Sequence, residues 1–205
     1  MSAAKVTLSP KELELVNNAD WILTKNHIIQ KVNELFSSLA NGYRQEYMQH
    51  ESFAKSPVFD IPPKISKGEQ YQLLPYMMLD FPRCFTDTDV FAIRTFFWWG
   101  NHCSIHLLLK GKFLAQYGPS IDRYFQLYGK YGVETKDWFI GIAQDPWQHH
   151  FEKDNYAVIQ DWNGYSVTML PFLKLAKKIP LEEWDDIESF MLNQFKKMLT
   201  ILTDY

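Results

Sequence analysis

The stretch from Tyr71 to Lys110 constrains the fold most, because it holds the densest apolar and aromatic sequence in the chain. β-Branched and aromatic residues run from Val90 to Trp99, and such residues favour strands. The run ends at Gly100-Asn101, a pair suited to a two-residue turn with a positive φ at its first position. We therefore predict a β-hairpin in which a strand over 90–99 returns as a strand over 102–110.

The turn also predicts which residues of the hairpin share a face. With Gly100-Asn101 as the two turn residues, Trp99 lies opposite His102, and the pairing continues along both strands. One face then mixes aromatic and polar side chains, a composition typical of a ligand cavity or of a face covered by helices. Its members are Thr95, Phe97, Trp99, His102, Ser104 and His106. The opposite face is apolar except for Arg94, and we expect it to face the core.

Arg94 is the one charge on that apolar hairpin face. An unpaired guanidinium in a core would be desolvated at a large cost in free energy. We therefore expect Arg94 to reach a carboxylate, and Asp80 and Asp161 are the acids whose strand positions make them candidates. The alternative partner is a ligand anion, because the arginine fork binds the carboxylates of proteins and ligands alike.

Helices are predicted at both ends of the chain. Ser9-Pro10-Lys11-Glu12 has the order of a capping box, and the apolar stripe that follows predicts a long N-terminal helix to Tyr47, with a bend near 17–20. A second stripe, with acids near its start and lysines toward its end, predicts a C-terminal helix from Pro180 to Leu202. Shorter helices are expected over 118–128 and 171–178, and a connector over 51–70.

Six segments have the composition and turn signals of strands, and no alternation of strands and helices suggests a parallel sheet. They are 71–80, 90–99, 102–110, 137–143, 155–162 and 165–170. We predict an α+β fold in which a single antiparallel sheet of about six strands is covered by the long N-terminal and C-terminal helices. Because 205 residues with 46% hydrophobic content can bury one core, we expect residues 1–205 to form a single domain.

Composition excludes several classes of protein. A formal net charge of -3 supplies no broad basic field, so we expect no nucleic-acid partner. No stretch approaches the ~18 continuous apolar residues of a membrane span, so we expect no membrane partner. Two cysteines, Cys84 and Cys103, do not form a disulfide framework and indicate a reducing compartment, the cytoplasm. Self-association as a homo-oligomer is compatible with the sequence.

Histidines are the candidates for metal binding and catalysis, since imidazole is a common metal ligand. On a strand that rises about 3.3 Å per residue, His102 and His106 stand roughly 13 Å apart, too far to share one ion. Adjacent His149 and His150 point to opposite sides of an extended chain. We therefore expect no metal and no cofactor. Ser104 lies between the first pair, but we expect it to lack the aligned hydrogen bond that a catalytic base needs.

Three functions remain open. The first is a ligand-binding or interaction protein whose aromatic and histidine-lined pocket takes a small molecule. Its candidate ligand-binding residues are Arg94, Phe97, Trp99, His102, Ser104 and His106. The second is a metal-assisted enzyme, a hydrolase or an oxygenase, that uses the same histidines with His149 or Asp80. The third is a structural interaction subunit with Trp147 and Tyr131 in an exposed apolar patch. No motif in the sequence identifies a ligand or a substrate.

Overall fold

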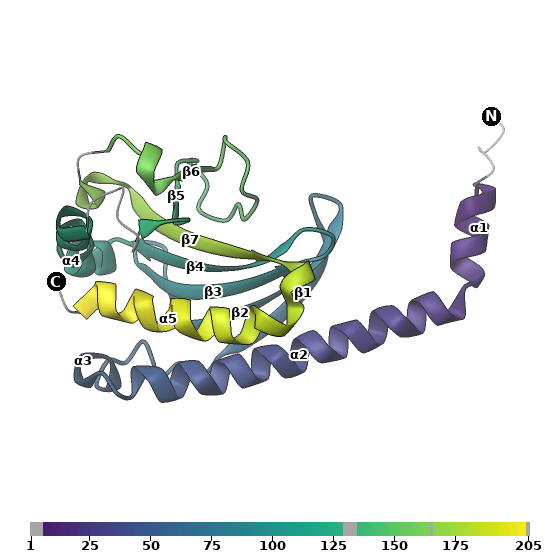
Figure 1. Ribbon diagram of the computed structural model, residues 1–205, viewed down its shortest axis with the longest axis horizontal. Coiled ribbons are helices and arrows are strands. Elements are labelled where there is room, and N and C mark those ends of the chain that lie inside the picture. Colours follow the sequence, from purple (N-terminus) through teal and green to yellow (C-terminus); the bar gives the residue numbers. More distant parts are fainter. Residues whose placement is uncertain (1–5, 129–134, 165, 204–205) are drawn as a thin grey trace.

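The computed structural model describes residues 6–128, 135–164 and 166–203, and within them one antiparallel sheet organises the chain. Its seven strands follow the order β1-β2-β3-β4-β7-β5-β6 (Figure 1). They are β1 (Lys64–Tyr71), β2 (Leu74–Phe85), β3 (Val90–Trp98), β4 (His102–Lys110), β5 (Phe139–Gly141), β6 (Tyr156–Val158) and β7 (Phe172–Pro180). The predicted α+β fold with a single antiparallel sheet is confirmed, with seven strands in place of about six.

The described ranges contain the helices α1 (Pro10–Asn17), α2 (Ala19–Tyr47), α3 (Glu51–Ala54), α4 (Lys112–Tyr128) and α5 (Ile187–Thr203). Of these, α2, α4 and α5 pack against one face of the sheet. Figure 1 shows α2 and α5 side by side along the sheet, where α2 contacts β2 and α5 contacts β4 and β7. The predicted cover by N-terminal and C-terminal helices is confirmed. Among the helices of the described ranges, none combines the length and the apolar character of a membrane span.

The core lies between the helices and the sheet. Tyr43 of α2 stacks on Phe195 of α5, with ring centroids 4.0 Å apart. The Tyr43 hydroxyl also shares a hydrogen bond of 2.9 Å with Thr95 of β3, so the helices and the sheet meet at one buried point. Burial raises the pKa of the nearby Cys103 thiol to about 12. This thiol therefore behaves as a small apolar side chain.

The start of the chain extends away from the sheet (Figure 1). The capping box between Ser9 and Glu12 is present and begins α1. No residue of α1 is buried against any other described residue. Asn18 then caps α2 by accepting a hydrogen bond of 3.0 Å from the Trp21 amide. The predicted bend near 17–20 is confirmed, and the first buried residue of α2 is Val32.

The β3–β4 hairpin forms as predicted, but its register differs by one residue. Trp98 lies opposite His102, which leaves the three residues 99–101 in the turn instead of two. Gly100 has a φ of 68°, and the Asn101 amide donates to the Trp98 carbonyl at 3.1 Å. Because side chains alternate along a strand, this shift moves every β3 side chain to the opposite face. Arg94 therefore lies on the histidine face, directly opposite His106.

The predicted helix over 171–178 is wrong, because these residues form strand β7 beside β4. Leu173, Leu175 and Ile179 of β7 belong to the core, while Lys174 points to the other face. Side chains of a strand alternate between its two faces, which places these three residues on one face, whereas the 3.6-residue repeat of a helix would not. Pro171 precedes the strand and does not begin a helix.

Other boundaries also differ from the prediction. The connector over 51–70 contains α3 and the polar edge strand β1. The strand predicted over 165–170 is a short 3-10 turn, Val167–Met169, and residue 165 lies outside the described residues. Strands 137–143 and 155–162 shorten to β5 and β6. The short helix begins earlier than expected, at Lys112, and includes Pro119.

Candidate functional site

The sheet face opposite the helices is covered by the connection between β5 and β6, residues 142–155, called here the β5–β6 loop. The Tyr71 hydroxyl, at the end of β1, accepts hydrogen bonds from the backbone amides of His149, at 2.6 Å, and His150, at 3.0 Å. From the other side, the Lys174 amine contacts the carbonyls of Pro146, at 2.8 Å, and Gln148. Two side chains, one from the edge strand β1 and one from β7, therefore hold the loop against this face.

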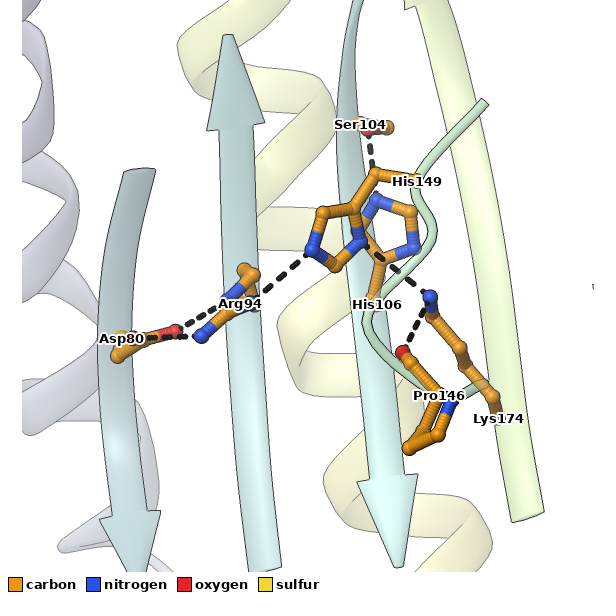
Figure 2. A network of polar contacts seen from close by, with 7 residues as sticks. All are labelled: Asp80, Arg94, Ser104, His106, Pro146, His149 and Lys174. Atoms are coloured by element: carbon orange, nitrogen blue, oxygen red, sulfur yellow. Dashed lines mark hydrogen bonds and ion pairs between the residues drawn. The ribbon is translucent and has the colours of Figure 1, made fainter. Parts of the chain in front are cut away.

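Asp80, Arg94 and His149 form a hydrogen-bonded chain beneath the loop (Figure 2). Arg94 Nε and Nη2 donate to the two carboxylate oxygens of Asp80, at 2.6 and 2.9 Å. The predicted pairing of Arg94 with Asp80 is confirmed, while Asp161 lies in the 3-10 turn Ile159–Asp161. Arg94 Nη1 lies 3.0 Å from His149 Nε2. Because a guanidinium has no acceptor, His149 Nε2 accepts this bond.

Lys174 of β7 is the last side chain in this hydrogen-bonded series (Figure 2). Its side chain is 2% exposed, and its Nζ lies 3.3 Å from His149 Nδ1. Burial, helped by the charge of Arg94, lowers the pKa of Lys174 to about 7. A lysine with a pKa near neutrality, next to an arginine and a histidine, is a typical feature of functional sites.

Counting donors assigns the charge of Lys174. Burial lowers the pKa of His149 well below its ordinary value, so the ring is neutral near pH 7. With Nε2 accepting from Arg94, its single ring proton lies on Nδ1. Nδ1 therefore donates to Lys174 Nζ, which offers a lone pair only as a neutral amine. The two amine hydrogens then donate to the carbonyls of Pro146 and Gln148.

Ser104, His106 and Tyr156 form a second hydrogen-bonded set on the same face. Ser104 Oγ lies 2.8 Å from His106 Nε2, and His106 Nδ1 lies 2.8 Å from the Tyr156 hydroxyl. The expectation that Ser104 lacks an aligned hydrogen bond to its histidine neighbour is therefore wrong. Ser104 is 0% and His106 1% exposed, so a substrate cannot reach the hydroxyl without movement of the loop. These bonds satisfy buried polar groups.

A cavity of about 290 Å³ opens beside Arg94, and we call it the aromatic cavity. Its lining consists of Tyr71, Tyr76, Met78, Arg94, Phe96, Trp147 and His149. Tyr76 stacks on Phe96 at a centroid distance of 5.3 Å, and Tyr71 meets Phe96 edge to face at 5.4 Å. Trp147 lies over the guanidinium, 5.5 Å from Cζ to the ring centroid, and is 44% exposed. Arg94 thus forms a polar end of an aromatic cavity.

A second cavity, of about 430 Å³, lies near the β3–β4 turn. Trp98, His102, Phe151 and Lys178 are among its lining residues. Burial, with the charge of Lys178, lowers the pKa of His102 to about 4, so this ring is neutral at pH 7. Trp98 Nε1 and His102 Nε2 are buried and have no hydrogen-bond partner in the described part of the chain.

The structure brings four of the six predicted site residues to one face of the sheet. Arg94, His102, Ser104 and His106 share the face beneath the β5–β6 loop. The prediction that Phe97 lies on this face is wrong, because Phe97 belongs to the core on the helix side. The same prediction for Trp99 is also wrong, since Trp99 lies in the turn and packs against that same core. Both corrections follow from the one-residue difference in register.

Sequence reasoning missed most of the aromatic cavity. Phe96 was assigned to the opposite face, and Tyr71 was treated as a strand residue with no role. Lys174 was placed in a helix. Leu173, Leu175 and Ile179 share one face of a strand, but the adjacent lysines at 177 and 178 break the alternation, so the sequence carries only a weak strand signal there. Trp147 carried no local signal for a site, because its place depends on the path of the loop.

Two other sequence-based hypotheses concern metals and exposed patches. Among the described residues, no group of three or more histidine, cysteine, aspartate or glutamate side chains is placed to hold a metal ion. The metal-assisted hypothesis combines the hairpin histidines with His149 or Asp80, and the structure shows both of the latter bonded to Arg94. Trp147 is half-exposed beside the aromatic cavity, while Tyr131 lies outside the described residues.

Comparison of the chain with family models, with curated proteins and with solved structures finds no match. The argument for function therefore depends on the geometry of the site.

Proposed function

We propose that this protein binds a small, flat and largely apolar ligand in the aromatic cavity, with Arg94 as the polar anchor. One observation carries the proposal: a fixed guanidinium forms one end of a cavity whose other walls are mainly aromatic. Apolar walls with a few placed polar groups are typical of small-molecule sites. The sequence also predicts an aromatic pocket, but with Phe97 and Trp99, whereas Phe96 and Trp147 line this cavity.

Arg94 keeps donors for a ligand although it is already paired. A guanidinium carries five N–H groups, and three of them serve Asp80 and His149. The other two, on Nη1 and Nη2, suit acceptor oxygens of a ligand, because adjacent guanidinium nitrogens bind planar groups in a bidentate manner. The pair with Asp80 fixes the fork before a ligand arrives. Little conformational entropy is therefore lost on binding.

The cavity volume limits the size of the ligand. About 290 Å³ lies at the lower end of ligand cavities, which are ~300–1,000 Å³. This volume favours one aromatic ring with a short polar substituent. Tyr76 and Phe96 offer ring faces against which such a ligand stacks. Trp147, which is 44% exposed in the ligand-free protein, would lose solvent contact when the ligand binds.

Titration calorimetry with benzoate and benzamide tests this proposal, since each probe is one ring with one acceptor group. We expect wild-type protein to bind at least one of them. Trp147→Ala removes a wall of the cavity and should bind it about ten-fold more weakly, a loss of about 1.4 kcal/mol. Trp21→Ala is the matched control, because Trp21 is 48% exposed on α2 and does not line the cavity. Absence of binding, or equal affinity in Trp147→Ala, contradicts the proposal.

We also propose a cytoplasmic location. Cys84 and Cys103 are both free thiols, and a reducing compartment keeps them so. Mass spectrometry of protein alkylated directly from cells tests this point. We expect both cysteines to be recovered as free thiols, and a disulfide to either one would contradict the location.

A further inference from the structure

Above about pH 7, and before a ligand binds, the hydrogen-bonded chain beside the aromatic cavity has no net charge. Asp80 compensates Arg94, and the bonding of Lys174 is that of a neutral amine. A neutral ligand would leave this balance unchanged. An anionic ligand on the free donors of Arg94 would add one uncompensated charge to a buried region, at a cost in free energy. Lys174 can supply the missing positive charge by binding a proton.

We infer that the aromatic cavity takes a small aromatic carboxylate, and that Lys174 binds one proton when this anion enters. The inference rests on the proposed binding function, to which it adds the charge of the ligand and its coupling to pH. The supporting geometry is the contact of a single imidazole with both basic side chains of the site, Arg94 and Lys174. His149 Nε2 lies 3.0 Å from Arg94, and its Nδ1 lies 3.3 Å from Lys174.

Without the proton, a carboxylate at Arg94 finds neither a donor in His149 nor a compensating charge. Before the ligand binds, His149 Nε2 accepts one hydrogen of Arg94 Nη1, so it offers only a lone pair. A carboxylate on the other Nη1 hydrogen and the free Nη2 hydrogen would therefore gain no bond from His149 and would leave its negative charge uncompensated.

One proton from solvent supplies both. His149 Nε2 receives the proton and donates to the carboxylate, which also accepts the Nη1 hydrogen that Nε2 releases, while the proton of Nδ1 passes to the Lys174 amine. His149 stays neutral in its other tautomer, and Lys174 becomes an ammonium. Its three hydrogens then donate to the carbonyls of Pro146 and Gln148 and to His149 Nδ1. The complex contains the protein, one carboxylate and one added proton, and no covalent bond to the ligand forms.

The groups that face Lys174 leave it as the site that titrates near neutral pH. They are Arg94 from β3, His106 from β4, Tyr156 from β6, and Asp145 and His149 from the β5–β6 loop. Burial lowers the pKa of both histidines and raises that of Tyr156, so these three stay neutral from about pH 6.5 to 9. Arg94 and Asp145 are the charged groups among them.

Calorimetric titration of wild-type protein with benzoate, in two buffers of different ionisation enthalpy, counts the protons exchanged. Near pH 8.5 we expect uptake of about one proton per benzoate, falling toward zero below about pH 6, where Lys174 is already charged. Above about pH 7 the Kd should rise by up to ten-fold per pH unit. Benzamide is the matched neutral probe, and it should bind with no proton exchange.

Lys174→Met provides the second arm of the test, because methionine keeps the buried apolar stem. Its benzoate affinity should be weaker at pH 7, independent of pH and free of proton uptake. A direct measurement covers the case in which this variant does not fold. The NMR titration of the Lys174 Cε resonance in wild-type protein should shift upward by about 2.5 pH units with benzoate present, as uptake of about one proton near pH 8.5 requires.

The outcomes separate the inference from the proposal beneath it. If benzoate binds without proton uptake near pH 8.5, or if benzamide binds and benzoate does not, the inference fails and the proposed binding function stands. If neither probe binds, the binding function itself fails, and the inference fails with it.

Discussion

The two faces of the central hairpin use alternate residues of the same strands and have opposite chemistry. On the helix side, Ile93 and Ile105 are fully buried, and Thr95 satisfies its hydroxyl by bonding to Tyr43. On the loop side, Arg94 joins an ion pair and hydrogen-bonded side chains beneath the β5–β6 loop. The difference follows from what covers each face.

A helix satisfies its own backbone, whereas a loop does not. Helices α2 and α5 therefore present only side chains to the sheet, and an apolar face suits them. The β5–β6 loop brings unpaired amides and carbonyls, which need donors and acceptors from the sheet. Tyr71 accepts hydrogen bonds from two amides of the loop, and Lys174 donates hydrogen bonds to two of the loop carbonyls. Polar residues beneath the loop are thus required for its attachment, and they also create the candidate site.

The largest expected effect distinguishes the two covers. Phe195→Ala on α5 removes a fully buried ring that stacks on Tyr43, so we expect a loss of about 3–5 kcal/mol in the free energy of unfolding. Trp147→Ala removes a half-exposed ring of the loop, and we expect the free energy of unfolding to fall by less than about 1 kcal/mol. Urea denaturation of both variants measures the contrast. Equal losses would mean that the loop is as much a part of the core as α5.

The second effect concerns the buried ion pair on the loop side. Arg94→Met leaves Asp80, which is 4% exposed, without its partner, and we expect a loss of about 3 kcal/mol in unfolding free energy. The double variant Arg94→Met, Asp80→Leu removes the unpaired charge and should recover most of this loss. Thermal and urea unfolding of the single and double variants measure the coupling. A double variant no more stable than Arg94→Met would contradict a structural role for the pair.

The third effect is a loss of stability in acid that originates on the loop side. The pKa of His102 is about 4 in the folded protein, against an ordinary value of 6.5, so the unfolded chain binds the proton more readily. The contribution of neutral His102 to the free energy of unfolding is fully present above pH 6.5 and is lost as the pH falls toward 4, by up to about 3 kcal/mol. His102→Gln should lose less stability over this interval than wild type. His27→Gln, exposed on α2, is the matched control and should follow wild type.

Much of the helix side is predictable from the sequence because periodicity reports burial directly. The stripes of α2 and α5 and the strands of the hairpin repeat at the spacing of their own structure, so local pattern and global fold agree. The hairpin register was not fixed in the same way. A two-residue and a three-residue turn at Gly100 differ by one position, and that difference exchanges the faces of β3.

The sequence nevertheless contained a sign of the correct register. The two-residue turn put Arg94 alone on an apolar face, whereas the observed register puts it among polar residues and opposite His106. A charge that conflicts with its predicted surroundings is evidence against the prediction. The polar edge strand β1 was missed for another reason: it has no buried residue within its described span, so no apolar alternation marks it.

The candidate site is less predictable because its parts meet only in three dimensions. Trp147 and His149 come from a loop with no periodicity, and their neighbours are strand residues far away in sequence. Lys174 needs β7 to be recognised as a strand before it reaches the site at all. Its neutral state further depends on hydrogen bonds to the loop backbone, which no pattern of residue types encodes.

The Tyr71 contact has a consequence for the order of folding. Its hydroxyl binds the His149 amide across 78 positions of the chain, whereas the β3–β4 turn joins residues that are neighbours in sequence. Contacts of such separation carry a larger entropy of loop closure and form after local ones. The hairpin can therefore form before the β5–β6 loop docks. Refolding followed by Trp147 fluorescence should then lag behind refolding followed by backbone circular dichroism.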